Sequence, residues 1–153
     1  MIKVVKFGGS SVANSTQFKK VRGIVESDPD RKFVVTSACG KESHEDHKIT
    51  DLLYLCDAHI RYGVSVEPIF QLIRDKYMRI KEDLGLKLDL ESEFARIRSH
   101  MDYGMSQDYL VSRGEYLTAR CLAEYLGADF VDAAECIIFR YDGSIDMERT
   151  GEM

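Results

Sequence analysis

The first part of the chain alternates short apolar runs with helical patterns. Residues 2–7 are rich in β-branched side chains and stop at two glycines and two serines, as a buried strand does where it enters a tight loop. Apolar residues recur at helical spacing over residues 18–25, until Pro29 and its polar neighbours break the pattern. Residues 33–36 predict a second buried strand. Strand, helix and strand in this order predict a βαβ unit with parallel strands and a right-handed crossover.

The rest of the chain is dominated by helical patterns. Amphipathic spacing predicts helices that begin at Ile49 and end near Gly63, and that cover residues 67–84, 90–103 and 106–126, with Gly127 as the final C-terminal stop. Residues 38–48 are polar and predict a surface loop. Residues 129–132 predict a third strand, and the charged tail after Phe139 predicts a loop or frayed end. The elements together predict one α/β domain.

Composition narrows the class of protein. The chain has 153 residues, 44% of them hydrophobic, with 21 Lys+Arg against 26 Asp+Glu and a net charge of −5. An acidic chain without a Lys/Arg run argues against nucleic-acid and anionic-membrane partners. No apolar stretch approaches the roughly 20 residues of a membrane span, and no signal peptide is evident, so we expect a cytoplasmic protein. The cysteines are expected to be reduced, mostly buried hydrophobes: Cys39, Cys56, Cys121 and Cys136.

The first segment that could carry chemistry is the loop after the first strand. Gly8 and Gly9 allow a ligand to approach the backbone, and the N–H groups at the start of the next helix favour an anion. Lys6 adds a positive charge, so Lys6, Gly8, Gly9 and Ser10 together predict a phosphate cradle. The loop matches neither the P-loop nor the dinucleotide fingerprint. An ordinary tight turn, with Ser10 or Ser11 as the helix N-cap, is the alternative.

Two further segments could carry chemistry. Small residues at positions 36–40 leave the carboxyl end of the second strand, where ligands gather in parallel sheets, so this loop should face the same crevice as the first; a plain turn is the alternative. Gly114 interrupts a helical pattern, which indicates close approach of another backbone or a helix start. Glu115 beside it could receive a substrate ammonium, or be a surface acid beside a packing glycine.

Two charged clusters are interpreted as structural. Residues 42–47 include two histidines and three acids but lack the helical spacing of a zinc protease, so a solvated loop is expected and no metal site is predicted. Residues 76–83 alternate charges around Tyr77 and Ile80, which is typical of a solvent-facing helix surface.

These segments together resemble one family. Residues 1–13 are similar, position for position, to the N-terminus of aspartokinases in the amino-acid kinase superfamily, with its K-F-G-G-[ST]-S-V-A loop. The resemblance continues in order through residues 34–38, 49–53 and 112–115. It implies a three-layer αβα sandwich around a mostly parallel sheet. It also implies that residues 1–153 are the N-terminal part of the catalytic domain, without the nucleotide-binding half and the ACT regulatory domains.

The resemblance implies phosphoryl transfer from ATP, with Mg²⁺ as its complex, to the side-chain carboxylate of L-aspartate. The product is 4-phospho-L-aspartate, in the first step of lysine, threonine and methionine biosynthesis. By resemblance, Lys6 is the catalytic cation that bridges nucleotide phosphate and transition state. The backbone of Gly8, Gly9 and Ser10 would donate to the phosphates. The full-length form is expected to be a homo-oligomer.

The aspartate side of the site also follows from the resemblance. Thr50 and Glu115 match aspartate-binding positions, with Glu115 pairing the substrate ammonium, and Ser37 lies where the second loop meets the acceptor. The loop from Gly40 to Lys48 is more charged than in relatives, which are also longer. We therefore expect the chain to carry the acceptor side and to be inactive alone. One alternative is a non-catalytic module that binds an amino acid or phosphate or needs a complementary chain. Another is a superfamily kinase for glutamate, carbamate or a nucleotide.

Overall fold

The first four elements form the predicted βαβ unit. In the computed structural model, which describes residues 1–102 and 104–152, the two strands pair in parallel, with Val5 opposite Val34. A short 3₁₀ turn separates the first strand from the helix that follows it. The bounds are β1 (Lys3–Phe7), η1 (Gly9–Val12), α1 (Ser15–Glu26) and β2 (Arg31–Thr36). The parallel pairing confirms the expected α/β class.

The predicted helices are confirmed, with small shifts at their ends. They are α2 (Ile49–Arg61), α3 (Glu67–Leu84), α4 (Leu90–Ser99) and α5 (Gln107–Leu126). Left-handed glycines end two of them, Gly85 after α3 and Gly127 after α5. The third helix was expected to reach Tyr103, which lies outside the described residues; α4 ends at Ser99, capped by His100. No helix in the described part of the chain is long and apolar enough to cross a membrane.

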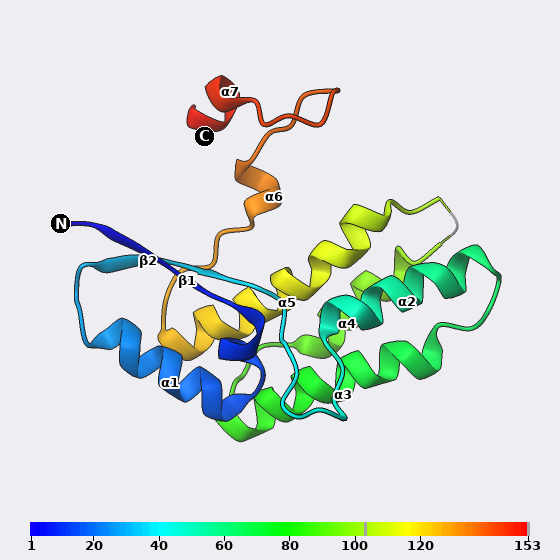
Figure 1. Ribbon diagram of the computed structural model, residues 1–153, viewed down its shortest axis with the longest axis horizontal. Coiled ribbons are helices and arrows are strands. Elements are labelled where there is room, and N and C mark those ends of the chain that lie inside the picture. The colour runs from blue at the N-terminus through cyan, green and yellow to red at the C-terminus, as the bar shows by residue number, and fades with distance from the viewer. Residues whose placement is uncertain (103, 153) are drawn as a thin grey trace.

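The sheet is covered on one face. Phe7 and Val34 pack against the core, and Figure 1 shows α1 and α5 below the strands. On the opposite face the side chains of Val4, Phe33 and Val35 are 66%, 58% and 51% exposed, so the expectation of strands buried on both faces is wrong. An apolar run alone does not tell whether a second layer covers a strand. The residues described here supply one helical layer, as expected for an incomplete sandwich.

The chain after α5 differs from expectation. Residues 129–132 form no strand. In the described part of the chain the sheet consists of β1 and β2, and neither of them pairs with these residues. The short helix α6 (Ala133–Cys136) follows these residues. The tail after Phe139 is not a plain loop, because it holds α7 (Met147–Gly151), and Ile145 forms a bridge with Phe139. Aspartates cap both short helices by accepting backbone N–H groups. This tail stands away from the helical body in Figure 1.

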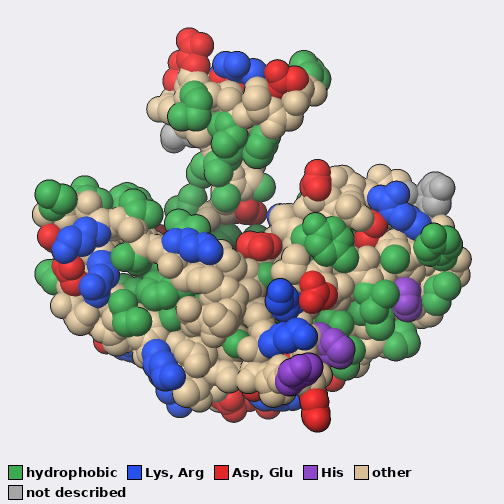
Figure 2. All heavy atoms as spheres, viewed as in Figure 1, with side chains coloured by type: hydrophobic (Ala, Val, Ile, Leu, Met, Phe, Trp, Pro, Cys, Tyr) green, Lys and Arg blue, Asp and Glu red, His purple; other side chains and the backbone are tan. Residues whose placement is uncertain are grey.

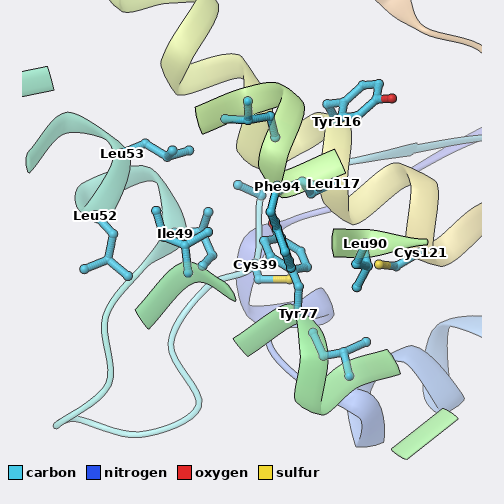
Figure 3. Close-up of a cluster of buried hydrophobic side chains, with 14 of the residues drawn as sticks. Cys39, Ile49, Leu52, Leu53, Tyr77, Leu90, Phe94, Tyr116, Leu117 and Cys121 are labelled. Atoms are coloured by element: carbon cyan, nitrogen blue, oxygen red, sulfur yellow. The ribbon is translucent and has the colours of Figure 1, made fainter. Parts of the chain in front are cut away.

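The core lies between the helices and contains a buried polar network. The Tyr77 hydroxyl donates to the Gly114 carbonyl at 2.9 Å and lies 2.8 Å from the Thr118 hydroxyl. The Cys39 thiol is 3.4 Å from the same hydroxyl. Figure 3 shows Cys39 and Tyr77 among the apolar side chains of α2, α4 and α5. The network therefore links the loop after β2 to the middle of α5.

Gly114 lets α5 approach this loop. A Cβ built there would lie 2.8 Å from the Ala38 Cβ and 3.1 Å from a methyl of Ile49. This confirms the interpretation of close approach, although the neighbours are side chains rather than backbone. A helix start at this position is excluded, because α5 begins seven residues earlier, at Gln107.

Two helix glycines give a matched test of this packing. Gly23→Ala in α1, where nothing lies within 4 Å of the new Cβ, should stabilise the protein by about 1 kcal/mol through helix propensity. Gly114→Ala gains the same term but overpacks the core, at a cost of about 1–3 kcal/mol. Urea unfolding should therefore place Gly114→Ala about 1–3 kcal/mol below Gly23→Ala. Equal stabilisation by both changes would contradict the packing role of Gly114.

Candidate functional site

The loop after β1 is a compact turn with a cation beside it. The Ser11 amide donates to the Gly8 carbonyl at 2.9 Å, which closes the turn. Lys6 is exposed, and its Nζ lies 3.9 Å from the place where a Cβ on Gly8 would be. The N-cap of α1 is Asn14, whose Oδ1 accepts from the Gln17 amide at 3.0 Å. The alternative role of Ser10 or Ser11 as helix cap is therefore wrong.

The loop after β2 lies directly against the first loop. The Gly40 amide donates to the Gly9 carbonyl at 2.9 Å, and the Ser37 amide donates to the Phe7 carbonyl at 3.0 Å. A Cβ on Gly40 would come within 2.6 Å of the Gly9 carbonyl carbon, so only glycine fits there. The two loops therefore meet at the carboxyl ends of the strands, whereas a ligand crevice shared by both stays a prediction.

The helices that carry the remaining predicted residues converge on the same loop. The Ile49 amide at the start of α2 donates to the Cys39 carbonyl at 3.0 Å, and Thr50 follows directly. Gly114 on α5 packs on Ala38, and Glu115 follows it. Within the described residues, the Glu115 carboxylate has no ion-pair partner. The elements are thus brought together, whereas the roles of their individual side chains stay predictions.

A cavity of about 860 Å³ opens beside the end of β2. Its polar wall comes from Thr36 and from one face of α5, with Ser112, Arg113 and Glu115. The opposite wall is largely apolar and includes Phe130 and other residues of the segment leading to the tail. Figure 2 shows apolar side chains along the stalk that joins the tail to the body. The cavity places a carboxylate and a guanidinium beside apolar surface.

Arg113 is a site feature that sequence reasoning missed. Only 5% of it is exposed, and its guanidinium lies 4.5 Å and 4.8 Å from the ring centres of Tyr109 and Tyr116. It donates to the Tyr109 carbonyl and to the Ser112 hydroxyl, and the described residues provide no carboxylate partner for it. Aromatic residues four before and three after an arginine in a helix are the signal that could have indicated this packing.

Lys76 on α3 corrects the interpretation of both charged clusters. Only 7% of its side chain is exposed, and its ammonium donates to the Gly40 carbonyl at 2.7 Å and to Asp46 at 2.6 Å. Residue 76 is therefore not on a solvent-facing surface, and the loop at 42–47 is anchored rather than only solvated. Lys76 follows Ile73 by three positions and precedes Ile80 by four, which places it on the apolar stripe of the helix.

The pKa of Asp46 reflects this contact. Partial burial acts to raise the pKa of the carboxyl group, but the hydrogen bond from Lys76 and those from the Glu42 and His47 amides outweigh it, so the pKa is lowered. Asp46 is therefore ionised near neutral pH and remains a counter-ion for the buried lysine. Among the described residues, no group of three or more His, Cys, Asp or Glu side chains is arranged to hold a metal ion.

Comparison with known proteins places the chain in a family. Residues 1–152 match the model of the amino acid kinase family, and the chain belongs to that family. This agrees with the parallel sheet and with the meeting of the two loops at its carboxyl end.

Within the family, the similar proteins found are aspartate kinases. Aspartokinase 3 of Bacillus subtilis (strain 168) is 35% identical over 152 residues, a match that covers 90% of this chain and 33% of that protein. The crystal structure of the aspartate kinase of Clostridium acetobutylicum is 46% identical, with a TM-score of 0.94 over 99% of this chain and 35% of that one. E. coli aspartokinase III, at 24% identity and a TM-score of 0.80, shares the fold. The chain thus spans about a third of the length of these relatives.

The three buried cysteines offer no ready thiolate to this site. Burial raises the pKa of the Cys39 thiol to about 11 and that of Cys56 to about 12, and it also raises the pKa of Cys121. Cys136 in α6 is partly exposed.

We expect iodoacetamide at pH 8 to alkylate the native protein at Cys136 and to leave the three buried cysteines intact. At a pKa of about 11 only about one thiol in a thousand is ionised at this pH, and burial also blocks access. Mass spectrometry of peptides against a urea-unfolded control, in which all four cysteines should react, checks this. Rapid native alkylation of Cys39 would contradict the buried network described above.

Proposed function

We propose that this chain forms the amino-acid-binding side and part of the phosphate cradle of an aspartate kinase. The reaction is transfer of the γ-phosphoryl group of ATP to the side-chain carboxylate of L-aspartate. The observation that carries the proposal is the meeting of three segments on residues 38–40: the glycine loop, the start of α2 and Gly114 of α5. The similarity to aspartate kinases at 35% and 46% identity supports the choice of substrate.

On the phosphate side, Lys6 acts as the cation that neutralises charge on the transferring group. The backbone of Gly8, Gly9 and Ser10 donates to the phosphate oxygens, which a loop held against Gly40 can do with little reorganisation. Phosphoryl transfer depends mainly on positioning and on neutralising charge on the equatorial oxygens. Mg²⁺ arrives with ATP and shields the phosphates.

On the acceptor side, Glu115 pairs with the substrate ammonium, while Thr50 and Ser37 hold the amino acid near the acceptor carboxylate. An unpaired carboxylate on the wall of a cavity favours a cationic ligand group. The proposal extends to a cytoplasmic role in the first step of lysine, threonine and methionine biosynthesis, and to a homo-oligomer in the full-length form.

The activity is tested by trapping the acyl phosphate with hydroxylamine. The assay uses the chain itself and a chimaera in which residues 1–152 replace the matching part of the C. acetobutylicum enzyme. We expect hydroxamate from the chimaera and at least a 100-fold loss with Lys6→Ala, because a charge contact made in the transition state is removed. Lys20→Ala on the exposed face of α1 is the control. An inactive chimaera that still binds aspartate would favour a non-catalytic module.

Glu115→Gln in the same chimaera separates binding from chemistry. Loss of the charge that pairs with the substrate ammonium should raise the aspartate KM about 10–100-fold and leave kcat within a few-fold, which corresponds to about 1.5–3 kcal/mol. Glu82→Gln on the exposed face of α3 is the matched control. An unchanged aspartate KM would remove Glu115 from the substrate site.

A further inference from the structure

Helix α3 is linked by polar side chains to the start of α1 and to the loop after β2. Asp83 accepts from the Ser15 hydroxyl at the start of α1 at 2.6 Å. Arg79 lies 3.7 Å from Glu42 in the loop after β2. Lys76 reaches the same loop one helical turn earlier. The helix therefore acts as a common support for the segments that follow β1 and β2.

Lys76 differs from the other two because it holds backbone. Its ammonium donates to the Gly40 carbonyl at 2.7 Å, while the Gly40 amide donates to the Gly9 carbonyl at 2.9 Å. A continuous chain of hydrogen bonds thus runs from α3 through Gly40 to the glycine loop. Gly40 packs so closely on Gly9 that it has no room for a side chain, so a shift of Gly40 would either displace Gly9 or break the hydrogen bond between them.

Core packing does not account for a lysine at this position. Lys76 lies between Ile73 and Ile80 on the apolar stripe of α3 and its side chain is buried, so an apolar side chain would be expected there, without a desolvation cost. A buried cation needs compensating partners, and here these are the Gly40 carbonyl and Asp46. Both partners belong to the loop after β2, which indicates that the lysine serves the placement of that loop.

We propose that Lys76 is a positioning residue, which holds Gly40 and, through it, the glycine loop in the arrangement that receives the phosphate groups. This rests on the proposed function. Lys76 touches neither the loop's ligand-facing glycines nor the acceptor residues, so its effect on binding is exerted through Gly40.

The test compares Lys76→Met with Lys20→Met, which makes the same change on the exposed face of α1. Both are made in the chimaera described above, because the chain by itself is expected to lack the nucleotide-binding half. Hydrogen exchange of the Gly40 amide, followed by NMR, reports whether Lys76 holds Gly40 against Gly9. Titration with MgADP, followed at the amides of Gly8, Gly9 and Ser10, measures the affinity of the glycine loop for the phosphate groups. In Lys76→Met we expect Gly40 exchange at least 10-fold faster and a Kd for MgADP about 10-fold higher. Lys20→Met should match the wild type in both.

Two outcomes overturn the proposal. Faster Gly40 exchange with an unchanged Kd would make Lys76 a purely structural residue. Unchanged exchange would show that Lys76 does not hold Gly40 in place. Absence of MgADP binding by the wild type is a different result, because it overturns the proposed function together with the inference built on it. Lys76→Arg keeps a buried cation beside Asp46 but has a larger, planar head, and it serves if Lys76→Met does not fold. In this variant the Kd for MgADP should rise together with Gly40 exchange, and a Kd that does not follow the exchange refutes the proposal.

Discussion

Three residues of backbone, Ala38-Cys39-Gly40, carry the contacts on which the candidate site depends. The Gly40 amide bonds to the glycine loop, the Cys39 carbonyl accepts from the first residue of α2, and Ala38 packs on Gly114 of α5. These contacts use backbone groups or a position without a side chain, so they leave little freedom in the spacing of the three elements. Residues 38–40 therefore set the distance between the glycine loop and α5, and with it the space for any ligand that both would hold.

Buried polar groups of α3 and α5 hold residues 38–40 in place. Thr118 and Tyr77 connect Cys39 to the Gly114 carbonyl, and Lys76 binds Gly40 from α3. Hydrogen bonds in a low-dielectric core are strong when every partner is satisfied, and costly when one is lost. The apolar packing of the helices, seen in Figure 3, provides the surroundings in which this network holds a single geometry. The fold thus places the two hydrogen-bonded loops at one end of a sheet whose outer face is exposed.

Local pattern predicted the βαβ unit and the long helices, because each depends on neighbours within one or two turns. It failed where a partner distant in sequence decides the outcome. Residues 129–132 have the composition of a strand but pair with neither strand of the described chain, and Val4 and Val35 are apolar but uncovered on the outer face. The motif residues Lys6, Thr50 and Glu115 could be selected from sequence by resemblance, whereas their roles stay predictions.

The sequence by itself determined the family, the order of the elements as far as α5 and the glycine loop, since these follow from motifs and short-range periodicity. Tertiary structure alone decided that Lys76, in a run of charges, is buried against Gly40. It also decided why Gly114 is a glycine, since its neighbour Ala38 is 76 positions away. The physical reason is common to Lys76 and Gly114: burial and close contact arise from elements that meet only in the folded chain, and no local window contains both partners.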